Sequence, residues 1–399
     1  MKVLVTGSNG FVGKNLVNAL LQIQKGNDKT RPELQIDEVY QCDVNTNEET
    51  LSRYCSDCDF VFNLAGVNRP KDPKEFADGN FNFLLYLLKN LSKFGNKCPV
   101  MLSSSIQASL VGRYKDSEYG KSKFAAEKLL LEYGKRIGVR TYIYRFPNLF
   151  GKWCKPNYNS VIATFCYNYA RNKNIKVNDP NTELELVYID DLVNAMLDAM
   201  EGKECRCDYD GLDVIKNPEG KYCYVPISYK VTLGQIVKTL DIIRAQPKTL
   251  MVPELRKDGF TKKLYSTYLS YLPKENTIFD LRTREDERGS FTELVKTVSG
   301  GQFSVNISKP GVSKGQHFHN SKWEFFIVVK GRALIRERNL SNGDIYEFIV
   351  SGDKLQAVHM LPGFTHSIKN LDTENELITM MWANEPFDQK HPDTFYEEV

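Results

Sequence analysis

The sequence predicts two domains of different fold class: a doubly wound α/β domain over residues 1–275 and an all-β barrel or jelly roll over residues 276–399. Three observations support this prediction. A length of 399 residues exceeds one average domain. Apolar strand-like runs alternate with helical patterns through the first part, with short connections. After about residue 275, short alternating runs separated by turns take over.

The elements of the first domain follow from the period of their apolar residues. "KVLVTG" is a short run of apolar and β-branched residues that ends at Gly7, and "FVGKNLVNALLQI" places its apolar residues on one helical face. Residues 26–37 are polar and contain proline, which predicts a surface loop. Strands are expected at 2–7, 38–43, 59–66, 98–105 and 140–151, and helices at 11–23 and 119–138.

The second domain is read from eight short runs of strand character. The segment 265–276, "YSTYLSYLPKEN", is the candidate junction that precedes them. The expected strands are 289–297, 301–308, 322–331, 332–339, 344–353, 355–363, 366–370 and 376–384.

Charge and cysteine usage exclude several classes of protein. A net charge of +3 without a dense basic block argues against nucleic acid or an anionic membrane as partner. No apolar stretch is long enough for a membrane span, and the N-terminus does not read as a signal peptide. The nine cysteines are irregularly spaced, and Cys55/Cys58 and Cys205/Cys207 lack a second pair at zinc-site spacing. We therefore expect free thiols and a cytosolic (cytoplasmic) protein.

A glycine-rich loop joins the first strand to the first helix. Gly7, Gly10 and Gly13 form GxxGxxG, which lets backbone N–H groups approach a pyrophosphate at a helix N-terminus. A tight turn without a ligand is the alternative. The expected cofactor contacts are Gly7, Asn9, Gly10, Phe11, Val12, Gly13, Leu64, Ala65 and Gly66, with Lys123 from the helix described next.

Tyr119 and Lys123 form a YxxxK arrangement at the start of the helix 119–138. One helical turn separates them, so the ammonium can lie beside the phenol and lower its pKa toward the working range. Serines 103–105 end the preceding strand, and one hydroxyl could bond the substrate oxygen.

Together with "NLAG" and "RFPNLFG", these motifs resemble the extended short-chain dehydrogenase/reductase family, which has a Rossmann-like fold. The resemblance covers roughly the first 270 residues. It implies that Tyr119 is the catalytic acid, Lys123 its modulator and Ser105 the third member, with Ser103 and Ser104 as alternatives.

The same resemblance places Asn148 near the substrate, whose diphosphate lies in the more C-terminal part of the domain. The following segment offers Lys152, Lys155 and Asn159 as further contacts; a solvated loop is the alternative. Asp43, after the second strand, could bond a ribose 2′-OH and favour NAD, or simply cap a turn. We expect NADPH rather than NAD because net reductive steps in biosynthesis favour NADPH, and the resemblances given below imply such a step.

All five histidines lie in the last 83 residues. On a strand, His317 and His319 point to the same face, and three imidazoles with a carboxylate suit Zn²⁺ or another first-row divalent ion. The spacing resembles both motifs of the cupin superfamily, which implies a jelly roll. The implied ligands are His317, His319, Glu324 and His366, whereas His359 and His391 lie outside the pattern.

The runs "DERGSFTELVKT" and "GQFSVNISKPGVSKGQHFH" resemble sugar-nucleotide 3,5-epimerases acting on 4-keto-6-deoxyhexoses. The resemblance implies that Arg288 and Glu293 hold the nucleotide and diphosphate. His317 matches the position of that family's catalytic base, but a histidine that gives its lone pair to a cation cannot abstract a proton. Either another group such as Lys314 is the base, or the site is not always metallated.

Three further stretches are "SSSIQAS", "IYRFPNLFGKWCKPNYNSVIATFCYN" and "KKLYSTYLSYLP". With them, the chain resembles along nearly its whole length the CapF-type capsular polysaccharide biosynthesis enzymes, which fuse a reductase domain to a cupin. The resemblance implies C3 epimerisation of a UDP-4-keto-6-deoxy-HexNAc in the cupin. NADPH reduction at C4 would then give UDP-N-acetyl-L-talosamine, a precursor of UDP-N-acetyl-L-fucosamine. We also expect a homodimer, because cupin barrels often pair edge strands between subunits. The alternatives are an epimerase or dehydratase that retains NAD, and a reductase whose cupin is only a metal-stabilised dimerisation module.

Overall fold

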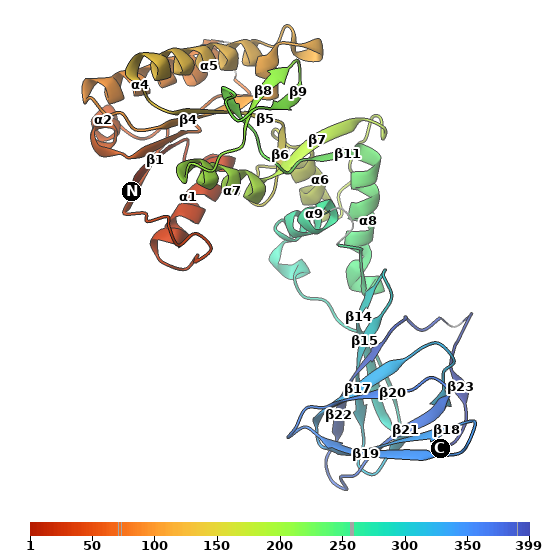
Figure 1. The fold of residues 1–399 in the computed structure, drawn as a ribbon. Helices are drawn as coiled ribbons and strands as arrows, with labels where there is room; N and C mark the ends of the chain where they lie inside the picture. Colours follow the sequence, from red (N-terminus) through yellow and green to blue (C-terminus); the bar gives the residue numbers. More distant parts are fainter. Residues whose placement is uncertain (71, 73, 256–258, 389) are drawn as a thin grey trace. The chain divides into compact units, whose positions relative to one another are not determined.

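The computed structural model describes residues 1–70, 72, 74–255, 259–388 and 390–399. The chain divides into two compact units, which Figure 1 colours from red to green and from green to blue. The first unit is Met1–Ile236 with Ser266–Tyr271, and the second is Val237–Tyr265 with Leu272–Val399. The chain thus leaves the first unit within helix α8 (Leu233–Thr249). The boundary at residues 275/276 stays a prediction.

The first unit is built on an eight-stranded sheet of order β2-β1-β3-β4-β5-β10-β8-β9, whose first five strands run parallel. Its strands are β1 (Lys2–Thr6), β2 (Glu38–Cys42), β3 (Phe60–Asn63), β4 (Val100–Ser105), β5 (Thr141–Phe146), β8 (Arg206–Asp210), β9 (Asp213–Lys216) and β10 (Tyr222–Cys223). A second sheet, β11-β7-β6, contains β6 (Asn148–Phe150), β7 (Glu183–Tyr188) and β11 (Tyr229–Thr232).

Helices cover both faces of the large sheet (Figure 1). Val3 and Val5 of β1 pack with α1 and α7, whereas Leu4 packs with α2, α4 and α5, because successive strand residues point to opposite faces. The predicted doubly wound α/β fold is therefore confirmed. The helices of this unit are α1 (Phe11–Gln24), α2 (Glu48–Asp57), α3 (Lys74–Phe76), α4 (Phe83–Lys93), α5 (Glu118–Ile137), α6 (Val161–Tyr169) and α7 (Ile189–Met200); η1 (Ala77–Asn82) is a π-helix, and η2 (Ile106–Ser109) and η3 (Gly112–Tyr114) are 3₁₀ turns.

The single strand expected over residues 140–151 is wrong. Pro147 separates β5, in the large sheet, from β6, in the three-stranded sheet. Proline has no N–H to donate to a neighbouring strand, so the ladder of a central strand ends there. The break carries the chain from one sheet to the other and places Asn148 just beyond the carboxyl end of β5.

Two antiparallel sheets form most of the second unit, and the predicted all-β domain is confirmed. Their inner faces pack around Phe326, Val328, Ile335 and Ile368, which lie on strands of both sheets. One sheet has β12 (Met251–Val252), β13 (Thr283–Asp286), β14 (Gly289–Thr297), β15 (Gln302–Ser308), β22 (Leu377–Ala383), β17 (Glu324–Lys330) and β20 (Ala357–Met360). The other has β19 (Ile345–Ser351), β18 (Arg332–Asn339), β21 (Phe364–Asn370), β16 (Ser313–Phe318) and β23 (Phe395–Tyr396).

Helical segments also occupy the region between the two predicted domains. Most of the expected junction 265–276 is helical, because α9 (Phe260–Leu269) extends into it and the 3₁₀ turn η4 (Lys274–Asn276) ends it. Within the ranges given above, no helix is long and apolar enough to cross a membrane.

Candidate functional site

The glycine loop makes one wall of a cavity of about 660 Å³ in the first unit. Gly7 has φ +66°, and a Cβ there would lie 2.7 Å from the Ala65 nitrogen; one on Gly13 would lie 2.2 Å from the Gly7 carbonyl oxygen. Side chains are thus excluded where the backbone must turn closely. Gly10 precedes α1 without a side-chain cap, so the first N–H groups of that helix have no capping side chain. The expected cofactor residues that line the cavity are Gly7, Asn9, Gly10, Phe11, Val12, Gly13, Leu64, Gly66 and Lys123. Ala65 instead donates its N–H to Thr6 Oγ1 over 3.2 Å.

Tyr119 and Lys123 line the same cavity. The Lys123 ammonium is buried, lies 5.8 Å from the centre of the Tyr119 ring and donates to the Ser103 carbonyl oxygen over 3.0 Å. Burial lowers the pKa of Lys123 to about 8, although Glu127 opposes this shift. Burial also raises the pKa of Tyr119 to about 12, against the effect of a hydrogen bond with Ser105. The expected lowering of the Tyr119 pKa is therefore wrong, because desolvation of the phenolate outweighs the hydrogen bond with Ser105.

The three serines at the end of β4 have different partners. The Ser103 hydroxyl donates to the Asn63 carbonyl oxygen over 3.2 Å, and that of Ser104 donates to Glu127 over 2.5 Å. The Ser105 hydroxyl accepts the N–H of Gln107 and bonds the Tyr119 phenol. This geometry favours Ser105 over its two neighbours as the serine that acts with Tyr119.

The predicted substrate residues separate into two groups. Asn148, Lys155 and Asn159 line the cavity. Lys152 does not: its ammonium forms an ion pair with Asp190. The Lys152 ammonium, which we expected to contact the substrate, is therefore paired with the carboxylate of Asp190 instead.

Asp43 also stands away from the cavity lining. Its carboxylate accepts the N–H of Asn45 over 2.9 Å and caps the turn after β2. Asp43 thus has the turn-capping role that we gave as the alternative to binding a ribose, and its position does not distinguish NAD from NADPH.

Asn80 is a site residue that the sequence analysis missed. Its buried side chain bonds both the N–H and the carbonyl of Val67 and also Ser122. A Cβ on Gly66 would lie 2.6 Å from Asn80 Oδ1 and 2.9 Å from Lys123 Nζ, so these groups pack tightly. Asn80 lies in the π-helix η1, and such segments are frequent at functional sites, but a single asparagine carries no spacing signal.

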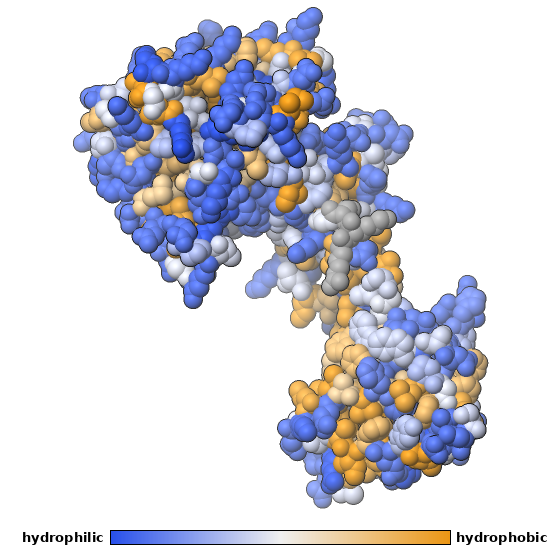
Figure 2. All heavy atoms as spheres, viewed as in Figure 1, coloured by the Kyte–Doolittle hydropathy of each residue, from blue (hydrophilic) through white to orange (hydrophobic). Residues whose placement is uncertain are grey.

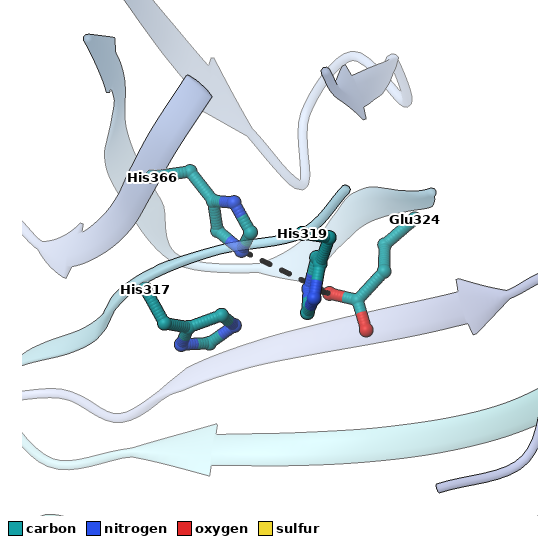
Figure 3. A group of neighbouring side chains, drawn as sticks. All are labelled: His317, His319, Glu324 and His366. Carbon is teal, nitrogen blue, oxygen red and sulfur yellow. Dashed lines mark ion pairs between the residues drawn. The ribbon is translucent and has the colours of Figure 1, made fainter. Parts of the chain in front are cut away.

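A second cluster lies in the C-terminal unit, where ligand atoms of His317, His319, Glu324 and His366 all fall within 4.8 Å of one another (Figure 3). His317 is on β16, His319 follows that strand, Glu324 opens β17 and His366 is on β21. One oxygen of Glu324 lies 3.7 Å from His319 Nε2 and 3.9 Å from His366 Nε2. His359 and His391 lie outside this cluster.

The protonation and bonding of the cluster fit a divalent metal ion. Burial lowers the pKa of His366 to about 3 and also lowers that of His317. Burial opposes ionisation of Glu324, yet the neighbouring His319 and Lys322 hold its pKa at about 2. His319 Nε2 and both ring nitrogens of His366 are buried and have no hydrogen-bond partner among the residues that the structure describes. Neutral imidazoles with free nitrogens beside an ionised carboxylate are the ligand forms that such an ion requires.

A cavity of about 510 Å³ opens onto this cluster. His317, Glu324, Lys314, Arg288 and Glu293 contribute to its lining. The Lys314 ammonium donates to Asn306 Oδ1 over 2.8 Å and to the Ile307 carbonyl oxygen over 2.9 Å, and burial lowers its pKa. Arg288 pairs with Asp286 over 2.6 Å, and Glu293 pairs with Lys296 over 3.0 Å.

These features define a nucleotide-binding α/β domain joined to an all-β domain with a metal-ligand cluster. Residues 3–207, more than half of the chain, match the NAD dependent epimerase/dehydratase family, and the chain belongs to that family. Residues 284–395 match the Polysaccharide biosynthesis C-terminal domain.

Two relatives match over the full chain. The chain is 40% identical to the UDP-2-acetamido-2,6-beta-L-arabino-hexul-4-ose reductase of Pseudomonas aeruginosa, over 99% of this chain and 98% of that protein. It resembles the crystal structure of the capsular polysaccharide assembling protein CapF from Staphylococcus aureus with a TM-score of 0.86 and 44% identity, covering 100% of both chains. The predicted kinship with CapF-type enzymes is thus confirmed.

A more distant structure shares the fold of the first unit. UDP-glucose 4-epimerase of Thermotoga maritima has a TM-score of 0.51 and 21% identity, over 70% of this chain and 100% of that chain.

Proposed function

We propose that this chain is a bifunctional enzyme of UDP-sugar synthesis for a capsular or other surface polysaccharide. Its C-terminal domain, a cupin, epimerises C3 of a UDP-4-keto-6-deoxy-HexNAc, and its reductase domain then reduces C4 with NADPH to UDP-N-acetyl-L-talosamine. The observation that carries this proposal is the full-length 40% identity to a protein named as a reductase of a UDP-2-acetamido-4-ulose. The product would be a precursor of UDP-N-acetyl-L-fucosamine.

In the reductase domain, the glycine loop and the N-terminus of α1 would hold the pyrophosphate of the dinucleotide. When bound, NADPH supplies the hydride for C4. Tyr119 delivers a proton to the C4 oxygen, and Ser105 orients that oxygen by a hydrogen bond. Lys123, fixed by the Ser103 carbonyl oxygen, positions the ribose and places a cation near the phenol. Asn148, Lys155 and Asn159 contact the UDP-sugar.

In the cupin, the C4 ketone acidifies the C3 proton, so the site needs a base and a group that stabilises the enolate. His317, His319, Glu324 and His366 hold a divalent ion, with zinc as our first choice, which would polarise the keto oxygen when bound. Lys314 faces the same cavity. Because its ammonium already donates three hydrogen bonds, to Ser290, Asn306 and Ile307, it is better suited to carry a positive charge than to abstract a proton. Arg288 and Glu293 bind the nucleotide portion at the cavity wall.

We further propose a homodimer formed through the C-terminal unit. Hydrophobic atoms gather over its surface where Figure 1 places β17, β19 and β22, as Figure 2 shows. On β19, an edge strand, Ile345, Phe348 and Ile349 are exposed, which supports burial against a second copy. The chemistry of NADPH and UDP-sugars, together with nine unpaired cysteines, supports a cytosolic location.

The test is to follow a UDP-4-keto-6-deoxy-HexNAc in D₂O by NMR, with and without NADPH. Without NADPH we expect deuterium at C3; with NADPH we expect stoichiometric cofactor oxidation and a C4 alcohol. Catalytic turnover without net NADPH consumption would favour the NAD-retaining alternative. Absence of C3 exchange in the metal-loaded protein would favour the cupin as a dimerisation module.

A further inference from the structure

The C-terminal segment 393–399 lies along β16, the strand that carries the proposed ligand His317 and ends just before His319. β23 pairs with the end of β16, with His317 opposite Tyr396 and Phe318 opposite Phe395. The same segment holds Gln316, which has φ +64° just before His317: its carbonyl accepts the N–H of Glu397 over 3.1 Å, and its amide oxygen accepts that of Val399 over 2.8 Å. A backbone conformation that is costly for a residue other than glycine is therefore fixed by the chain terminus.

Within this segment, the carboxylate of Asp393 accepts several hydrogen bonds from one short stretch of backbone. Its carboxylate accepts the N–H groups of Asn320 (2.9 Å), Ser321 (2.7 Å) and Lys322 (2.8 Å), and also the Ser321 hydroxyl over 3.0 Å. These three residues form the turn between the ligands His319 and Glu324. One carboxylate thus fixes the backbone on which both ligands depend.

The backbone of Asp393 acts directly on His319. Its carbonyl oxygen contacts His319 Nδ1. A carbonyl oxygen can only accept, so Nδ1 carries a proton, and in the neutral form of the ring the lone pair is then on Nε2. Nε2 is the nitrogen that faces Glu324, and it is buried without a hydrogen bond to any part of the chain that the structure describes.

We propose that Asp393 is a positioning residue of the metal centre. Its carboxylate fixes the turn 320–322, and its carbonyl fixes the tautomer and orientation of His319, so that Nε2 is presented to the ion. Outer partners of this kind typically change metal affinity by about 10–100-fold when they are removed. The inference rests on the metal binding proposed above but not on the epimerase reaction.

The test is zinc affinity of the full chain, measured by competition with a chromophoric chelator at fixed pH. Asp393→Asn replaces one acceptor oxygen with an NH₂ group that faces backbone N–H donors, and we expect the Kd for zinc to rise about 10–100-fold. Asp393→Glu keeps the charge and should recover part of the affinity. The matched control is Asp388→Asn, since Asp388 is a nearby exposed carboxylate that pairs with His391.

A second readout separates positioning from a general loss of structure. In ¹⁵N-histidine NMR of the zinc-loaded protein, we expect His319 to be protonated at Nδ1 in the wild type and to lose this single state in Asp393→Asn. Far-UV circular dichroism verifies folding of each variant. Wild-type zinc affinity in folded Asp393→Asn would overturn the inference, as would a His319 ring protonated at Nε2. Wild-type protein that binds no zinc would instead refute the metal proposal itself.

Discussion

Lys123→Met is expected to stabilise the protein at neutral pH while it abolishes ketone reduction. Lys123 is almost fully buried, and burial lowers its pKa from the ordinary 10.5 to about 8. That difference corresponds to about 3 kcal/mol against the charged form at pH 7. The lost hydrogen bond to Ser103 offsets part of this gain, about 1.5–3 kcal/mol for a charged donor.

The pH dependence isolates the charge from the packing of the new side chain. Between about pH 8 and 10.5 the unfolded chain binds more protons at Lys123 than the folded chain, so the stability of the wild type rises with pH through this window. From pH 7 to pH 10 the wild type should gain about 2.5 kcal/mol relative to Lys123→Met. Below pH 7 the difference between the two proteins should be constant.

The assay is urea unfolding of the cofactor-free chain followed at 222 nm, because helices α1 to α7 all belong to the first unit. Lys121→Met is the matched control: Lys121 lies half a turn away on α5, is exposed and pairs with Glu118. Because Lys121→Met keeps Lys123, its stability should rise between pH 7 and pH 10 about as much as that of the wild type. Parallel stability profiles of the wild type and Lys123→Met would refute the reasoning that Lys123 is strained by desolvation.

Three further outcomes are expected. Tyr119→Phe should abolish NADPH oxidation and spare deuterium exchange at C3; loss of both activities in a folded variant would contradict separate sites. Elemental analysis of freshly purified, unchelated protein should give one divalent metal per chain, and His366→Ala should remove most of it because it deletes a buried ligand. A fragment of residues 276–399 should bind zinc, dimerise and exchange the C3 proton without binding NADPH, whereas an N-terminal fragment that makes the full product unaided would argue against the division of labour.

The sequence predicted those parts of the molecule that local pattern determines. The strand, glycine loop and helix at residues 2–24 depend on apolar period and on glycine, and the structure has them where the pattern placed them. The histidine cluster could also be predicted from the sequence, because residues two positions apart along a strand point to the same face. The break at Pro147 could have been found, since the residue itself is a local signal against a central strand.

Hydrogen bonds and ion pairs between residues far apart in the sequence could not be predicted from local pattern. Lys152 pairs with Asp190, 38 residues later, and Asp393 bonds the turn after His319, more than 70 residues earlier. The position of a lysine or an aspartate in the sequence does not indicate which opposite charge or N–H group will lie beside it in the fold. Residues expected to bind a ligand can therefore be occupied within the protein, as Lys152 is.

The direction in which the pKa of Tyr119 shifts decides whether its phenol acts as an acid or as a base. A phenol whose pKa is lowered toward neutrality would serve as a base, which suits oxidation of an alcohol. Burial instead raises the pKa of Tyr119 to about 12, so the phenol keeps its proton at neutral pH. A protonated phenol, bonded to Ser105, is the form required to protonate the oxygen of a ketone as hydride arrives at the carbon. The protonation of Tyr119 thus suits reduction, the direction named for the Pseudomonas aeruginosa relative.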